Sequence, residues 1–218
     1  MCVTTAARDP APRGEWTWVI GPFAMLLGVG GVMLYRAVRD HFSDAARLTR
    51  TLAQVPVTPI GDVEPGRVVR VVGTVEPHEE TLTAPLCRRT CVYWNVQVEE
   101  QHKPGVGGPF VPLAHGIEHR PFVLRDATGH LVVEPTNILA SVPDAPPRWK
   151  ITPELEAFLT RCGVPPAPRT LAYTEVVLEL GKRVSVVGLA TAREGAGALR
   201  VVDMPDGALL LSSAPTGG

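Results

Sequence analysis

The sequence predicts a mainly β domain that follows an N-terminal transmembrane helix. Three observations lead to this fold class. Residues 16–35 contain no charged side chain. From residue 57 onward, apolar and polar residues alternate with the period of two that is typical of strands. The 218 residues include 22 prolines and 21 glycines, which fits many short strands joined by turns better than it fits long helices.

Composition narrows the classes of protein to which the chain belongs. Hydrophobic residues make up 45% of the chain and charged residues 20%, which favours a packed core over disorder. The net charge of −1 argues against a nucleic-acid partner held by electrostatics. Four cysteines are too few for a disulfide scaffold of this size and do not fix the redox compartment. They are Cys2, Cys87, Cys91 and Cys162.

The uncharged segment 16–35 predicts a membrane-spanning helix. Twenty helical residues extend about 30 Å, the thickness of a bilayer core. Trp16 and Trp18 lie at one end and Tyr35 at the other, as aromatic anchors at the two membrane surfaces do. A cleaved signal peptide is the alternative, but the segment lacks an A-x-A-like site and is longer than a usual signal core. We therefore expect a retained single span after an N-terminal tail, residues 1–15.

Small residues recur along the predicted span at spacings of three and four, which places them on one helix face. Such a face lets two transmembrane helices approach closely, so it is the candidate surface for a homodimer. The alternative is that glycine is simply frequent in membrane helices. The residues are Gly21, Ala24, Gly28 and Gly31.

Residues 36–55 predict an amphipathic juxtamembrane helix that ends before Pro56. Its apolar residues fall on one stripe, suited to packing on the following domain or to lying on the membrane surface. Four arginines in this segment, against two before the span, favour a cytoplasmic location for the large C-terminal part. The stripe consists of Val38, Phe42, Ala45, Leu48 and Leu52.

Residues 56–213 are expected to form the β-rich domain, followed by a disordered tail, 214–218. One helix is predicted, with Thr152 as its cap, Pro153 in its first turn and Gly163 at its end. In the strand at 91–99, alternation places Val92, Trp94, Val96 and Val98 on one face and Tyr93, Asn95, Gln97 and Glu99 on the other. Further strands are expected within 66–77, 121–135, 173–192 and 199–213.

Two segments of this domain resemble each other. Residues 64–73 and 179–188 both contain a glutamate, a glycine, a basic residue, alternating valines and a final Val-Gly. Each is expected to form a strand of a small OB-like barrel, in which glycine permits the bend. Convergent strand composition explains the similarity almost as well as duplication does.

The candidate chemistry of the chain is limited. Cys87 and Cys91 are separated by three residues, and a four-ligand metal site would need His115 and His119 to join them. Closed zinc sites usually have ligand pairs at tighter spacing, so we expect no metal and no cofactor. The sequence contains no Gly-x-Ser-x-Gly, P-loop or Gly-x-Gly-x-x-Gly motif, and we expect no catalytic residues.

The stretch "TLTAPLCRRTCVYWNVQVEE" resembles the signature of the GIDE domain, also called the beside-a-membrane (BAM) domain. The stretches "FVLRDATGHLVVEP" and "YTEVVLELGKRVSVVGLA" resemble later parts of the same family, so the similarity covers about residues 58–212 in order. The positions that carry it are Pro85, Leu86, Cys91, Tyr93, Trp94, Glu99, Asp126, Gly129, Pro135, Tyr173, Glu175, Gly181 and Gly188.

This resemblance implies a membrane protein related to ubiquitin ligases, but the chain shows neither the RING of those enzymes nor their second span. We expect non-catalytic recognition of a partner protein or ligand beside the membrane. The alternatives are a membrane component of a ubiquitin ligase-like or stress system, and a structural membrane-organising protein. The expected location is a bacterial inner membrane. Mitochondrial members of the family carry the domain in the intermembrane space, which conflicts with the arginine count here. The side of the membrane on which the domain lies therefore stays open.

Overall fold

The computed structural model describes residues 2–4, 54–102, 108–141, 148–192, 199–205 and 208–213. The predicted anchor with its face of small residues, and the juxtamembrane helix up to residue 53, lie outside these ranges. Within them, no helix has the length and apolar character needed to cross a membrane. The described part is mainly β, as the sequence predicts, with one α-helix.

Five strands close into a barrel. They are β2 (Val68–Pro77), β6 (Phe122–Arg125), β7 (His130–Val133), β10 (Arg183–Ala192) and β11 (Leu199–Val202). The strands pair in the cyclic order β2-β6-β7-β11-β10, and β10 returns to β2. All pairs are antiparallel except β7 with β11. This closed five-stranded arrangement confirms the predicted OB-like barrel. The two similar segments, 64–73 and 179–188, supply its neighbouring strands β2 and β10.

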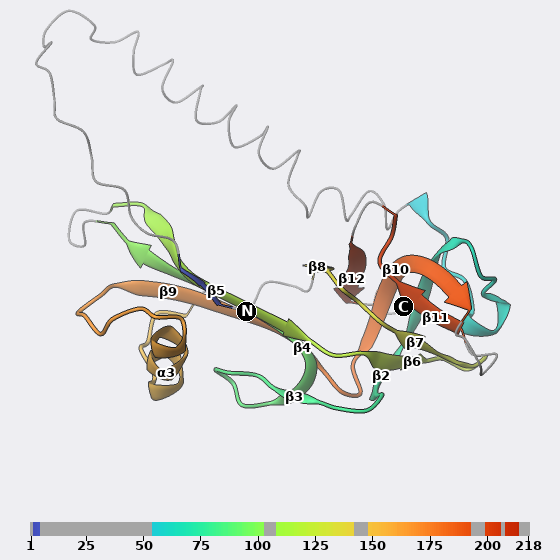
Figure 1. Cartoon of the computed structure of the whole chain (residues 1–218), viewed down its shortest axis with the longest axis horizontal. Helices are drawn as coiled ribbons and strands as arrows, with labels where there is room; N and C mark the ends of the chain where they lie inside the picture. Colours follow the sequence, from blue (N-terminus) through green and yellow to red (C-terminus); the bar gives the residue numbers. More distant parts are fainter. Residues whose placement is uncertain are drawn as a thin grey trace, which may run out of the picture. The chain divides into compact units, whose positions relative to one another are not determined.

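A second sheet is inserted into the connections of the barrel (Figure 1). Strands β3, β4 and β5 lie between β2 and β6 in the sequence, whereas α3 and β9 lie between β7 and β10. The long strand β4 pairs with β3, β5 and β9, and β1 pairs with the outer edge of β5. The bounds are β1 Cys2–Thr4, β3 Leu82–Thr83, β4 Thr90–Gln101, β5 Phe110–His119, α3 Pro153–Arg161 and β9 Leu171–Glu179.

Three short elements complete the fold. Strand β12 (Leu209–Ser213) pairs with β10, and β8 (Ile138–Ser141) pairs in parallel with β12. The 3-10 helix η1 (Ile60–Asp62) precedes β2 and buries Ile60 in the barrel. The helix α3 begins as predicted, because the Thr152 hydroxyl accepts a hydrogen bond from the Leu155 amide at 3.3 Å.

The domain has two apolar cores. One fills the barrel and includes Val71, Phe122 and Leu124, all with no exposed side-chain surface. The other lies between the second sheet and α3, where Trp94 meets the ring of Phe158 edge-on at 6.4 Å.

The predicted faces of β4 are partly wrong. Trp94, Val96 and Val98 do share the face toward α3. However, Val92 lies in the barrel core, and Tyr93, assigned to the opposite and more polar face, is only 1% exposed and lies there too. The reason is an irregularity between Cys91 and Tyr93 in the pairing with β9, which interrupts the strict alternation of sides.

Asp126 organises the turn between β6 and β7. Its carboxylate accepts backbone hydrogen bonds from Ile60, Thr128 and Gly129 at 2.7–2.9 Å, and one more from the Thr128 hydroxyl. Burial alone would raise the pKa of Asp126, but these donors outweigh it and hold the pKa below the usual value of 3.8. The ionised form therefore ties η1 to the turn.

We expect the Asp126 tie to make the domain sensitive to acid. Because the pKa is lowered on folding, its stabilisation is complete above the ordinary pKa and is lost as the pH falls through the folded value. Urea unfolding measures the stability of each protein at about pH 6 and at about pH 3. Between these two pH values, Asp126→Asn should lose less stability than the wild type does. Asp62→Asn removes an exposed carboxylate on η1 and should lose as much stability as the wild type between these pH values. Identical losses in the wild type and Asp126→Asn would show that the Asp126 carboxylate does not cause the acid sensitivity.

Candidate functional site

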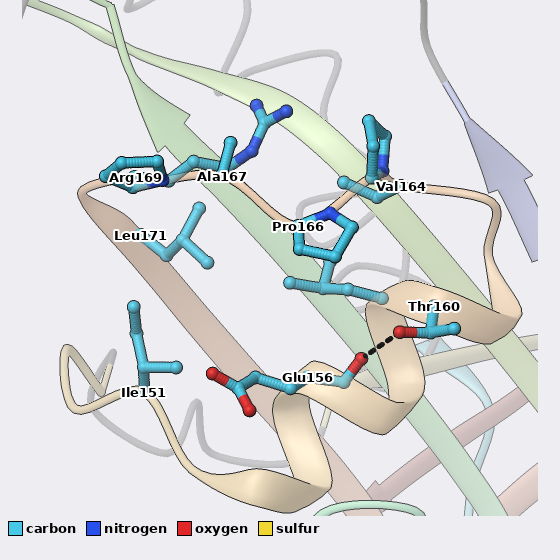
Figure 2. A pocket seen from close by; sticks show the side chains of 11 residues that line it. Ile151, Glu156, Thr160, Val164, Pro166, Ala167, Arg169 and Leu171 are labelled. Atoms are coloured by element: carbon cyan, nitrogen blue, oxygen red, sulfur yellow. Dashed lines mark hydrogen bonds between the residues drawn. The ribbon is translucent and has the colours of Figure 1, made fainter.

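A groove lies between α3 and the segment that returns from it to β9 (Figure 2). Its volume is about 530 Å³, within the range of small-ligand and peptide pockets. Most of the lining is apolar. The lining side chains come from the segment before α3, from one face of α3 and from the returning chain, and they include Ile151, Leu159, Val164, Pro166, Ala167 and Leu171.

The sequence explains why α3 ends where it does and why the segment after it is extended. Gly163 adopts a left-handed conformation, φ +77°, and so ends α3 at a position that L-residues rarely tolerate. Three prolines follow within residues 165–168, and proline can neither continue a helix nor donate to a sheet. The segment therefore stays extended and largely exposed until β9 begins at Leu171.

Two charged residues line the groove. Glu156 is exposed on α3. Arg169 is mostly buried, and its Nη1 donates to Glu100 Oε2 at 2.6 Å. The Nε of Arg169 is buried without a hydrogen-bond partner in the described part of the chain. An unsatisfied buried donor is costly to the folded state.

Two aromatic rings, those of Phe110 and Trp149, pack together outside the groove lining. Trp149 is 56% exposed, and its ring contacts Phe110 edge-on at 5.1 Å. Tyr173 fixes the backbone of this segment, since it exchanges two backbone hydrogen bonds with Arg148 and its hydroxyl donates to the Lys150 carbonyl at 3.0 Å. Tyr173, a position of the family resemblance, thus has a positioning role.

Glu175 holds the loop that carries the first cysteine. Its two carboxylate oxygens accept the backbone N–H groups of Leu86 and Cys87, each at 2.8 Å. The same loop contains Arg88 at φ +60°, a strained conformation for a non-glycine residue. Burial raises the pKa of the Cys87 thiol, and burial followed by the neighbouring Cys87 raises that of Cys91 to about 11. These raised pKa values favour the protonated form of both thiols near neutral pH.

We expect Glu175→Gln to loosen this loop. The amide side chain retains only one acceptor oxygen, so one of the two backbone donors loses its partner, at a cost of about 1–3 kcal/mol. Cys87 should then react faster with a thiol reagent such as DTNB in native buffer. The matched control is Glu179→Gln on the same strand, which removes only the exposed pair with Arg89. Equal Cys87 reactivity in both variants would show that the carboxylate does not hold the loop.

The four candidate metal ligands do not come together. Cys87 and Cys91 lie at the start of β4, whereas His115 pairs with Gln97 farther along that strand and bonds Asn95 through its ring. His119 lies on β5, as His115 does, and pairs with Tyr93 of β4. Among the residues that the structure describes, no group of three or more His, Cys, Asp or Glu side chains is placed to hold a metal. The described structure therefore gives the four-ligand alternative no support.

The other positions of the family resemblance serve the fold rather than one site. Pro85, Cys91, Tyr93, Trp94, Pro135 and Gly188 are buried, Leu86 is half-buried and Glu99 is exposed on β4. Gly181 makes the β9–β10 turn at φ +76°. The groove consists of residues that the sequence analysis did not select. The three prolines within residues 165–168 indicate that the chain leaves the helix there, but not that it returns alongside α3.

Comparison with protein-family models, with curated proteins and with solved structures yields no match to this chain.

Proposed function

We propose that this chain is a membrane-anchored, non-catalytic recognition module of the GIDE type, and that its groove beside α3 binds an apolar segment of a partner protein. The observation that carries the proposal is the groove itself. Leu159, Val164 and Leu171 offer an apolar floor, and Glu156 adds an exposed carboxylate at its edge. An extended peptide suits such a groove, because its apolar side chains can lie on the floor.

The charges of the groove favour one kind of segment. Glu100 neutralises Arg169, whereas Glu156 makes no ion pair among the described residues. A bound segment with a basic side chain beside its apolar residues would therefore complement the groove better than an acidic one. Recognition without catalysis also agrees with the family resemblance, in which the RING rather than this domain performs ubiquitin transfer.

The test is site-specific photo-crosslinking in the native membrane. A photoreactive benzoylphenylalanine replaces Ala167, an exposed residue of the groove, and in a control replaces Ala127, an exposed residue of the β6–β7 turn. We expect discrete adducts from position 167 that map to an apolar segment with a nearby base, and their loss when Glu156→Lys is added. The same adducts from both positions, or none from position 167, would refute groove recognition.

The anchor is tested separately. The uncharged segment 16–35 leads us to expect that the full chain stays with the membrane fraction after washing with alkaline carbonate. A variant with Leu26→Arg and Leu27→Glu introduces two charges in the middle of the segment and should be released by the wash. Release of the unaltered chain would exclude an integral anchor and would leave the groove proposal to its own test.

A further inference from the structure

Residues 148–151, Arg-Trp-Lys-Ile, present apolar and basic side chains alternately at the surface. Trp149 is 56% exposed and Ile151 43%, and both are among the few large hydrophobic residues exposed in the described part of the chain. Arg148 and Lys150 are exposed as well. Neither forms an ion pair within the described ranges, so their charges are available to a partner.

This segment is held in place rather than loosely attached. Tyr173 binds the backbone on both sides of Trp149, with hydrogen bonds of 2.9 and 3.0 Å to Arg148 and one of 3.0 Å to Lys150. The ring of Phe110 supports the indole from the side. An exposed tryptophan that is fixed in this way loses little conformational freedom when it binds, which favours binding.

The Trp149 ring and α3 lie on opposite sides of the second sheet. Glu100 faces α3, because it pairs with Leu171 of the groove, and Phe110 is opposite the next residue, Gln101. Successive strand residues point to opposite sides, so Phe110 and the Trp149 ring on it lie on the side away from α3 and its acidic first turn. Glu99 of β4 is exposed on that side, and the two exposed bases Arg148 and Lys150 flank Trp149 in the chain.

We propose that this end of the second sheet, defined by Arg148, Trp149 and Lys150, contacts the surface of a bilayer that contains anionic lipids. Tryptophan prefers the membrane interface, where its ring is apolar and its N–H remains hydrated. Lysine and arginine beside it attract anionic headgroups, and each strengthens such contact about fivefold. The contact goes beyond the proposed groove function. It orients the domain on the membrane and leaves the groove open to a partner.

Brominated lipids test this contact in the full chain, because bromine quenches tryptophan at the depth of the acyl chains. The chain is combined with phosphatidylcholine vesicles that contain either no phosphatidylglycerol or about 30% of it. The difference in emission between the wild type and Trp149→Phe isolates the signal of Trp149 from those of Trp16, Trp18 and Trp94. We expect strong quenching of this signal only in the anionic vesicles.

A charge-matched pair of variants tests the role of the bases. Arg148→Gln/Lys150→Gln should reduce the quenched fraction of the Trp149 signal by at least about twofold. Lys182→Gln/Arg183→Gln removes the same charge from the exposed β9–β10 turn and should leave the fraction unchanged. Salt at about 1 M should also reduce the quenched fraction of the Trp149 signal, because it screens exposed charges.

Three results would overturn the proposal. One is a Trp149 signal that is unquenched in both lipid mixtures. Another is equal quenching with and without anionic lipid. A third is protection of Trp149 from acrylamide in native membranes but not in vesicles of lipid alone, which would assign this surface to a protein partner. None of these results affects crosslinking from position 167, so failure here is distinguishable from failure of the groove function.

Discussion

Replacing Gly188 by alanine is expected to prevent closure of the barrel. A Cβ atom at this position of β10 would lie 2.4 Å from the Val202 carbonyl oxygen and 2.5 Å from a methyl of Val201. Real Cβ atoms essentially never approach so closely, and the first contact is with backbone, which cannot rotate away. Overpacking of about 1–3 kcal/mol would lower the melting temperature by roughly 2–12 °C for a domain of this size.

The matched control for this prediction is Gly129→Ala in the β6–β7 turn. Gly129 also belongs to the family resemblance, but a Cβ atom there would meet only a methyl of Ile60 at 3.6 Å, an ordinary contact. Melting followed by circular dichroism should therefore show a large loss for Gly188→Ala and a small change for Gly129→Ala. Equal losses would mean that β11 does not pack against β10 as described.

Trp94→Ala is expected to produce the second large effect, a loss of about 3–5 kcal/mol from a total that is typically 5–15 kcal/mol. Trp94 is 8% exposed and packs against Phe158 of α3 over Gly116. A side chain on Gly116 would come within 3.1 Å of both rings, so the glycine creates the space that they fill. Removing the indole leaves a cavity under the helix and should detach α3.

Urea unfolding and the helical circular dichroism signal measure this loss. Gln97→Ala on the same strand is the control, because Gln97 is exposed and its truncation leaves no cavity. The helical signal should decline before the strand signal in Trp94→Ala. Losses of similar, small size in both variants would show that the sheet does not rest on α3.

Local chemistry made much of the fold predictable. The cap at Thr152, the proline after it and the glycine at 163 predict α3 almost to the residue. Valine-rich runs bounded by turns predict β2, β10 and the hairpin of β6 and β7. These signals are short-range, and a single sequence contains them in full.

The parts that sequence did not predict depend on contacts between distant segments. β5 carries Pro112, Gly116 and polar side chains, and it becomes a strand because β4 supplies its hydrogen bonds. The reversal at Val92 and Tyr93 follows from the pairing with β9, more than 80 positions later. The groove likewise needs α3 and the returning chain side by side, and no motif encodes that arrangement.

The inserted strands have a consequence for the order of folding. Pro77 at the end of β2 must find Phe122 at the start of β6, and the whole β3-β4-β5 insertion lies between them. Bringing such distant ends together costs chain entropy unless the intervening segment has already become compact. The hairpin of β4 and β5 is local, so it should gain protection from hydrogen exchange before the barrel does. A mutation in the part of that hairpin that packs on α3 would then slow the acquisition of native structure without altering the barrel once it has formed.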